Sequence, residues 1–358
     1  MTDNRITWID NLKALGIFLV VLAHHENDLP NYLLKYIYSF HVPLFFFASG
    51  LVFNPDKYTS IKILLIDKVR SLLIPYFVFS FLTYLFWLIL NVTRGYVAIG
   101  SSDMILPLIG IFYSSNWIWM THNPPLWFLT CLFVVEVEFY LLYQYSRKVH
   151  VSGALVLCLL LALSISGSIM SRYFLFRLPW GLDISITALP LFGIAFYAKP
   201  ILFKLLKRDN LPAFRTLIPL LIFLLSISIF VSSAGDFVNM GCNRVHDYFH
   251  FIVAGIAGVL SCCIISAIIP RNRILTFIGA NTIIILAFHL PAWSFMRGIQ
   301  LALSKIHWDL LQSSIIVNTI YSLIQIMLTV PIILFVNRYL PLIIKHDSPR
   351  GLHFNKLS

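Results

Sequence analysis

The feature that most constrains the fold of this chain is a series of uninterrupted apolar segments, most of them roughly 16–25 residues long. Hydrocarbon offers no water to satisfy backbone N–H and C=O groups, so a segment that crosses it must be a helix or a strand of a closed barrel. Barrel strands alternate polar and apolar residues over about 10 positions, whereas these runs are continuously apolar and near the about 20 residues of a spanning helix. The chain is therefore predicted to be an all-α integral membrane protein.

Ten candidate transmembrane helices follow from these runs, at residues 11–25, 39–54, 71–91, 125–145, 151–170, 183–198, 215–233, 248–269, 274–291 and 313–338. A further apolar stretch, 104–113, is too short to cross a bilayer and is interpreted as a re-entrant or surface helix. The sequence shows no internal repeat and no linker, so residues 1–358 are expected to form a single domain.

The basic residues indicate how these helices are oriented. If the N-terminus is cytoplasmic, 19 of the 26 Lys and Arg residues fall on the cytoplasmic side and 7 on the outer side. This asymmetry follows the positive-inside rule and predicts that both termini are cytoplasmic. The net charge of +11 is spread over short loops rather than gathered in a basic block, so membrane lipid is the expected partner and nucleic acid is not.

The first apolar run carries Lys13 and His24, eleven residues apart. At 100° per residue this spacing is about 20° more than three full turns, so both side chains are predicted on one helix face, about 16–17 Å apart along the axis. Ionisable groups inside a span are costly and are functional candidates for that reason. The alternative is structural: Lys13 snorkels to the inner interface, and His24 ends the helix.

Three further polar residues are predicted to lie near His24 at the outer ends of the spans. His41 begins the second run, Asp183 begins the sixth and His289 ends the ninth. An imidazole titrates near neutral pH and suits proton transfer, and a carboxylate can orient or charge it. We therefore take the three histidines as candidate catalytic residues and Asp183 as a partner for one of them.

At the inner side, Lys68 and Arg70 precede the third run. They act as topology determinants and also suit a phosphorylated cytosolic donor, because Arg binds phosphate bidentately and Lys as a point charge. Glu136 and Glu138 lie within the fourth run and diverge by about 200° on a helix, so one is expected to face a cavity as a proton carrier. We take Glu136 as the candidate, with Glu138 as the alternative.

The sequence predicts no metal site. It contains no metal-ligand motif, phosphate-binding glycine loop or nucleophile elbow. His246 and His250 have i,i+4 spacing but no convincing third ligand. The five cysteines form no disulfide framework and are expected to be reduced.

Six segments carry a family resemblance: RITWIDNLKALGIFLVVLAHH, SFHVPLFFFASGLVF, KVRSLLIPYF, PLWFLTCLF, LPWGLDISITALPLFGIAFY and IGANTIIILAFHLP. In this order they resemble the membrane-bound acyltransferase family 3, in particular bacterial O-acetyltransferases of the fucose 4-O-acetylase type. The resemblance runs from Trp8 to about Pro291. It implies a multi-pass enzyme of the bacterial inner membrane with about ten transmembrane helices.

The resemblance also assigns roles to residues. The family has a basic residue, ten intervening positions and a histidine in its first span, and Lys13 and His24 match this pattern with Lys in place of the commoner Arg. It implies that His24 is the catalytic histidine and that Lys13 is coupled to it. The family's basic pair before the third span matches Lys68 and Arg70 and is associated with the acyl-CoA end of the site.

Together these features predict an O-acyltransferase that moves an acyl group from cytosolic acetyl-CoA or another acyl-CoA to a hydroxyl of a cell-envelope glycan or lipid-linked sugar. His24 would act as general base or be acylated itself, with Asp183 or an intramembrane glutamate orienting the ring. The alternative is a proton-coupled transporter or flippase of a glycan or lipid. Such transporters often have repeated halves, which this sequence does not show.

Overall fold

The computed structural model describes residues 6–25, 29–94, 104–115, 119–173, 177–207, 211–212, 214–302 and 314–344. These residues form helices and no strand, apart from an isolated bridge between Asn239 and Arg244, which confirms the predicted all-α class. The longer helices are Thr7–Ala23 (α1), Asn31–Val52 (α2), Ile61–Lys68 (α3), Ile74–Arg94 (α4), Ile105–Tyr113 (α5), Trp127–Lys148 (α6), Gly153–Tyr173 (α7), Leu182–Leu205 (α8), Phe214–Ala234 (α9), Tyr248–Ile268 (α10), Arg273–Ala280 (α11), Thr282–Ala302 (α12) and Ile315–Tyr339 (α14). Short helical turns are Pro55–Lys57 (η1), Val69–Leu73 (η2), Pro124–Leu126 (η4), Pro179–Gly181 (η5) and Met240–Cys242 (η7).

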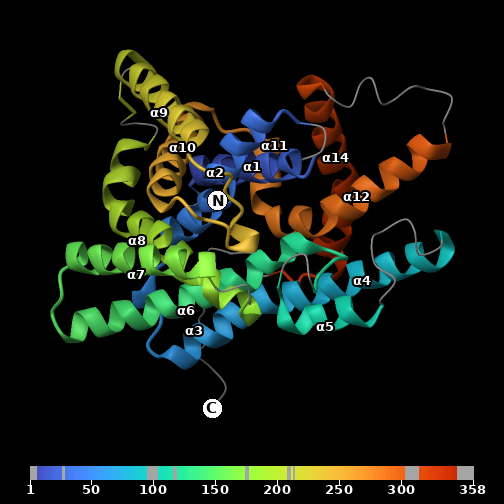
Figure 1. Cartoon of the computed structure of the whole chain (residues 1–358), viewed down its shortest axis with the longest axis horizontal. Coiled ribbons are helices and arrows are strands. Elements are labelled where there is room, and N and C mark those ends of the chain that lie inside the picture. The colour runs from blue at the N-terminus through green and yellow to red at the C-terminus, as the bar shows by residue number, and fades with distance from the viewer. Residues whose placement is uncertain are drawn as a thin grey trace.

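The first two long helices lie at the centre of the bundle. α1 packs against α2, α10, α11, α12 and α14, and α2 packs against α8, α9 and α10. Figure 1 shows α1 and α2 near the middle, with α7 to α10 on one side and α4, α12 and α14 on the other. α2 and α8 approach so closely that a Cβ on Gly50 would lie 2.3 Å from the Phe192 carbonyl oxygen, so this crossing requires glycine.

Seven helical segments of the described chain are long and apolar enough to span a membrane, and the bent pair α11 and α12 is an eighth if it forms one span. The seven are Ile61–Val92, Pro124–Lys148, Gly153–Tyr173, Pro179–Leu205, Arg215–Ala234, Tyr248–Ile268 and Ile315–Tyr339, and each contains one predicted run or overlaps most of it.

The two central helices are not among these segments. α1 has only 17 residues and contains Asp10 and Lys13, and α2 contains Lys35 and His41. Most of both helices is buried by other helices, and Asp10 and His41 are themselves buried inside the protein. The total of ten spans and the cytoplasmic location of the termini remain predictions.

Two irregular junctions shape the core. Pro75 has no N–H to offer to the preceding turn, and the chain widens into the π turn Val69–Leu73 between α3 and α4. The predicted run 274–291 is divided between α11 and α12, which meet at 84°. Asn281 at this bend donates to the Phe277 carbonyl and accepts from Asn337, so the bend is held by side-chain hydrogen bonds.

Candidate active site

A cavity of about 310 Å³ lies between α1, α2, α6 and α12. The turn that contains η7 contributes Asn239, Met240 and Gly241 to its wall. Most of the lining is apolar or aromatic, and its polar members include His24, Tyr38, His41, Thr121 and Asn239. We call this space the histidine cavity.

A second cavity, of about 670 Å³, adjoins the first. Its charged lining residues are Lys13, Lys57 and Lys68 together with Asp10, Asp67 and Glu136, and we call it the polar cavity. The two cavities share a wall made of Phe45, Phe128, Leu129, Thr282 and Ile283. His24 therefore faces a space inside the protein that lies next to a chamber lined by lysines and carboxylates.

One face of α1 runs along both cavities. Ile9, Asp10 and Lys13 line the polar cavity, while Ile17, Val20 and His24 line the histidine cavity. These positions repeat every three or four residues, which is the period of one helix face. Lys13 and His24 thus lie on the same side of α1, as their spacing predicts, with one residue in each cavity.

The three candidate histidines are held in the same tautomer. Each Nδ1–H donates to a carbonyl oxygen of its own helix: His24 to Val20 at 2.7 Å, His41 to Ile37 at 2.8 Å and His289 to Leu286 at 2.8 Å. A carbonyl oxygen only accepts, so the hydrogen is on Nδ1 and the lone pair is on Nε2 of each ring. An Nε2 lone pair is the group that a general base requires.

His24 and His289 are in direct contact across α1 and α12. Their ring centroids are 4.8 Å apart, with an interplanar angle of 65°. His289 is fully buried, and its Nε2 has no hydrogen-bond partner within the described part of the chain. A proton gained by His24 would therefore lie on a ring that contacts a buried imidazole.

The neighbouring His25 has a different environment. Its Nε2 donates to Gln325 Oε1 at 3.2 Å, and its ring packs edge-on against Trp293 at 4.5 Å. The side chain is buried between α12 and α14 and does not line the histidine cavity. Of the two adjacent histidines, His24 is thus the one that faces the site.

The position of His289 is supported by a proline two residues later in α12. Pro291 lacks the N–H that would bond to the Ala287 carbonyl in a regular helix. The Asn123 side-chain amide donates to this carbonyl at 2.8 Å, and Asn123 is itself fully buried. The segment before α6 is therefore fastened to α12 next to the histidine pair.

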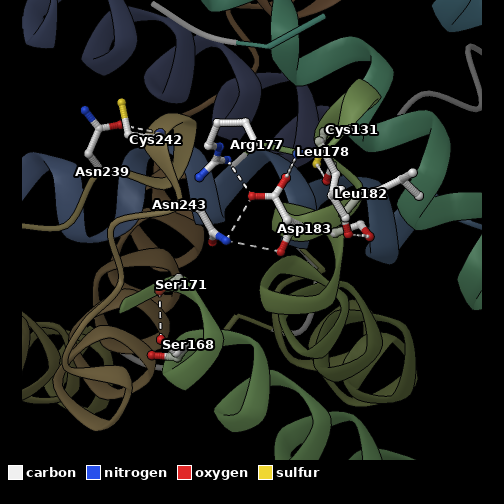
Figure 2. Close-up of polar contacts among 12 residues, drawn as sticks. Cys131, Ser168, Ser171, Arg177, Leu178, Leu182, Asp183, Asn239, Cys242 and Asn243 are labelled. Atoms are coloured by element: carbon white, nitrogen blue, oxygen red, sulfur yellow. Dashed lines mark hydrogen bonds and ion pairs between the residues drawn. The ribbon is translucent and has the colours of Figure 1, made fainter. Parts of the chain in front are cut away.

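Asp183 lies in a different polar cluster, shown in Figure 2. Its carboxylate pairs with Arg177 at 2.9 Å and accepts hydrogen bonds from Asn243 at 3.1 Å and from the Leu178 N–H at 3.3 Å. Burial lowers the pKa of Arg177, and the Asp183 carboxylate opposes that shift. Because Asn243 directly follows the η7 turn, these contacts fasten one wall of the histidine cavity to α8.

Of the three predicted donor-binding residues, two line the polar cavity and one lies outside it. Lys68 lines the polar cavity and forms an ion pair with Glu136 at 2.9 Å, with side chains 14% and 7% exposed. Lys13 lines the same cavity, whereas Arg70 is exposed in the π turn and lies outside the lining. Glu136 is thus brought to the predicted phosphate-binding lysine rather than to a histidine.

Several lining residues did not stand out in the sequence. Asp10 lies one helical turn before Lys13, a spacing that would have indicated it. Tyr38 and Asn239 line the histidine cavity, but only the packing of distant segments brings them there. No group of three or more potential metal ligands occurs in the described residues, and none of the five cysteines forms a disulfide bond.

The model of the Acyl_transf_3 acyltransferase domain matches residues 6–338, which is nearly the whole chain and includes every residue of both cavities except Ile344. The protein belongs to acyltransferase family 3. Comparisons of this acyltransferase with curated proteins and with solved structures gave no match. Membership of the family makes the protein a membrane acyltransferase, and it agrees with the resemblance carried by the six sequence segments.

Proposed function

We propose that this acyltransferase moves an acyl group, in the first instance acetyl, from cytosolic acetyl-CoA to a hydroxyl of a cell-envelope or lipid-linked sugar at the bacterial inner membrane. The observation that carries this proposal is the position of His24. Its ring lines the histidine cavity with the lone pair on Nε2, and the same face of α1 continues into the polar cavity.

The polar cavity is the donor site in this proposal. Lys13 and Lys68 line it and supply ammonium groups for the phosphates of CoA. An ammonium has three donors, so Lys68 can keep its ion pair with Glu136 while it binds a phosphate oxygen. Glu136 is then a positioning residue for Lys68. The thioester end of the donor reaches toward His24 along α1.

In the histidine cavity, His24 acts as the general base. Its Nε2 takes the proton of the acceptor hydroxyl while the hydroxyl oxygen bonds to the thioester carbonyl carbon. The carbon–sulfur bond then breaks, and the CoA thiolate takes the proton from His24, which returns to its neutral tautomer. During this step the buried Nε2 of His289 accepts a hydrogen bond from the protonated His24 ring.

The remaining polar groups of the histidine cavity suit a sugar. Tyr38, His41 and Asn239 offer donors and acceptors for hydroxyl groups, and Trp127 offers an aromatic face. In a largely apolar cavity a few placed polar groups fix the orientation of a ligand. The lining therefore supports a polyhydroxyl acceptor that is oriented by hydrogen bonds.

The test is an acyl-transfer assay with the purified protein in lipid nanodiscs. Acetyl-CoA labelled in the acetyl group is incubated with free and lipid-linked sugars, and label in the sugar and free CoA are measured. We expect both to rise together and only when an acceptor is present. Mass analysis of surface glycans from cells with and without the gene then identifies the modified sugar.

A transporter would behave differently in the same assay. It would leave the label on CoA with every acceptor and would move a fluorescent lipid-linked glycan across the membrane of a sealed vesicle. That pair of results would overturn the proposed enzyme.

A further inference from the structure

The wall between the two cavities contains a pair of aromatic side chains. Phe45 of α2 and Phe128 of α6 line both cavities, and their ring centroids are 5.8 Å apart with an interplanar angle of 63°. Phe45 follows His41 by four residues and so lies on the same face of α2. Any group that passes from the polar cavity to His24 crosses this wall.

Both rings are held in place by their surroundings. Phe128 packs against the fully buried Phe46, with ring centroids 5.0 Å apart. Phe45 lies over Gly16 of α1, where an added Cβ would come within 3.1 Å of the ring. Gly16 lies between Lys13 and His24, and the absence of a side chain there lets the Phe45 ring lie this close to α1.

The size of the histidine cavity limits what can lie beyond the wall. Its volume of about 310 Å³ is at the lower end of the range for small-ligand sites, about 300–1,000 Å³. A sugar ring that presents its hydroxyl to His24 leaves space for a short acyl group and not for a long chain. The aromatic wall and the volume of the histidine cavity therefore both limit the length of the acyl chain.

We propose that Phe45 and Phe128 form an aromatic gate that restricts the acyl donor to short chains and keeps water of the acceptor side away from the thioester. This inference rests on the proposed function. The gate admits an acetyl thioester between the rings, whereas each added methylene must displace a packed ring. Widening the gate also lets water replace the sugar as nucleophile, which converts acetyl-CoA and water into acetate and free CoA.

The test compares donors of different chain length. For wild type, Phe45→Ala and Phe128→Ala, kcat/KM is measured with acetyl-CoA and with butanoyl-CoA, together with the release of CoA in the absence of acceptor. A hydrophobic pocket discriminates about 10–200-fold per methylene. We expect either variant to raise the butanoyl-to-acetyl ratio at least about 10-fold and to increase acceptor-independent CoA release.

Phe133→Ala is the matched control. Phe133 is on the same helix as Phe128 and packs against Trp180, outside both cavities. Gly16→Ala should act in the opposite direction. The added methyl would lie 2.7 Å from Leu44 and 3.1 Å from the Phe45 ring, and displacement of that ring narrows the passage and lowers use of butanoyl-CoA more than use of acetyl-CoA. The smaller truncations Phe45→Leu and Phe128→Leu, checked by size-exclusion chromatography, provide the same comparison if an alanine variant does not fold.

Two results would contradict the proposed gate. One contradicts the gate alone, and the other also contradicts the proposed function. If wild type transfers acetyl and the Phe45 and Phe128 variants keep the chain-length ratio of Phe133→Ala, the gate is wrong and the proposed function stands. If wild type transfers no acyl group from any acyl-CoA, the proposed function fails and the gate fails with it.

Discussion

At the scale of single residues, the site depends on which nitrogen of each imidazole carries the hydrogen. Backbone carbonyls of α1, α2 and α12 fix Nδ1 as the donor in His24, His41 and His289. His25 instead donates from Nε2 to Gln325. Two adjacent histidines thus present different nitrogens, and only His24 turns its ring to the cavity. The difference arises because the His24 ring bonds to a carbonyl of its own helix, whereas the His25 ring bonds to a side chain of α14.

The first prediction concerns His289. Replacing it with Phe removes the acceptor beside His24 but leaves the hydrogen bond from His24 to Val20. A hydrogen bond to a charged group contributes about 1.5–3 kcal/mol, which corresponds to about 10–100-fold in rate. We expect kcat of His289→Phe to fall by this factor with little change in KM for the donor. His289→Gln keeps an acceptor and should recover part of the rate, and equal loss in both variants would argue for a packing role alone.

At the scale of elements, prolines and polar side chains together set the position of the site. Pro291 frees a carbonyl in α12, Asn123 occupies it, and the segment before α6 is held against the helix that carries His289. On the other side of the cavity, the η7 turn is held through Asn243 to Asp183. The cavity walls are therefore fastened by contacts that the catalytic step does not use.

The second prediction tests the contact between Asn123 and the Ala287 carbonyl. Asn123→Ala leaves a buried carbonyl without a partner, so the free energy of unfolding should fall by about 1–3 kcal/mol. Pro291→Ala restores an N–H at the position that bonds this carbonyl in a helix. In the Pro291→Ala background, Asn123→Ala should therefore lower the free energy of unfolding by less than it does in the wild type. The free energies of unfolding of the wild type, the two single variants and the double variant are measured in mixed detergent. If Asn123→Ala lowers the free energy of unfolding equally in both backgrounds, the Asn123 amide does not stabilise the protein through this carbonyl.

The third prediction concerns the ion pair of Arg177 and Asp183. The side chains are 15% and 16% exposed, so removing one partner leaves a largely buried charge. Arg177→Met should lower the free energy of unfolding by about 3–5 kcal/mol, while the double change Arg177→Met with Asp183→Leu should cost less than the sum of the single changes. Additive losses, measured by the same unfolding assay, would show that the two side chains act independently.

At the scale of the whole molecule, the apolar runs predicted seven of the long apolar helices in the described chain well. The prediction was less complete for α1 and α2, because a helix buried by other helices tolerates Asp10, Lys13 and His41 and so loses its apolar signature. The bend at Asn281 also escaped prediction, since the run around it stays apolar and one of its two side-chain hydrogen bonds comes from the distant Asn337.

The relative positions of two site residues could be predicted only where both lie on one helix. The spacing of Lys13 and His24 places both on one face of α1, and the structure has them there. The order of the spans predicted that His289 lies on the same side of the membrane as His24. The direct contact of their rings and the pairing of Lys68 with Glu136 join elements far apart in the chain, so no local pattern encodes these contacts. For the same reason the sequence did not indicate Arg177 and Asn243, which the structure shows in contact with Asp183.

The fourth prediction tests the orientation of the molecule. In a background with the five native cysteines replaced by alanine, Lys62→Cys and Arg244→Cys each add one thiol at an exposed position. The positive-inside rule puts Lys62 in the cytoplasm and Arg244 outside. A membrane-impermeant maleimide added to intact spheroplasts should label Arg244→Cys at once and Lys62→Cys only after lysis. The reverse pattern would contradict the orientation.

In the proposed reaction, the Nε2 of His24 is the base that takes the proton of the acceptor hydroxyl. The most direct measurement is the rate of labelled acetyl transfer in membranes that contain equal amounts of folded His24→Gln or His25→Gln protein. General base catalysis contributes about 10²–10⁴-fold. His24→Gln should therefore lose at least about 100-fold, whereas His25→Gln, which keeps a donor for Gln325, should stay within about 10-fold of wild type. Transfer at the wild-type rate by the His24 variant would contradict the claim.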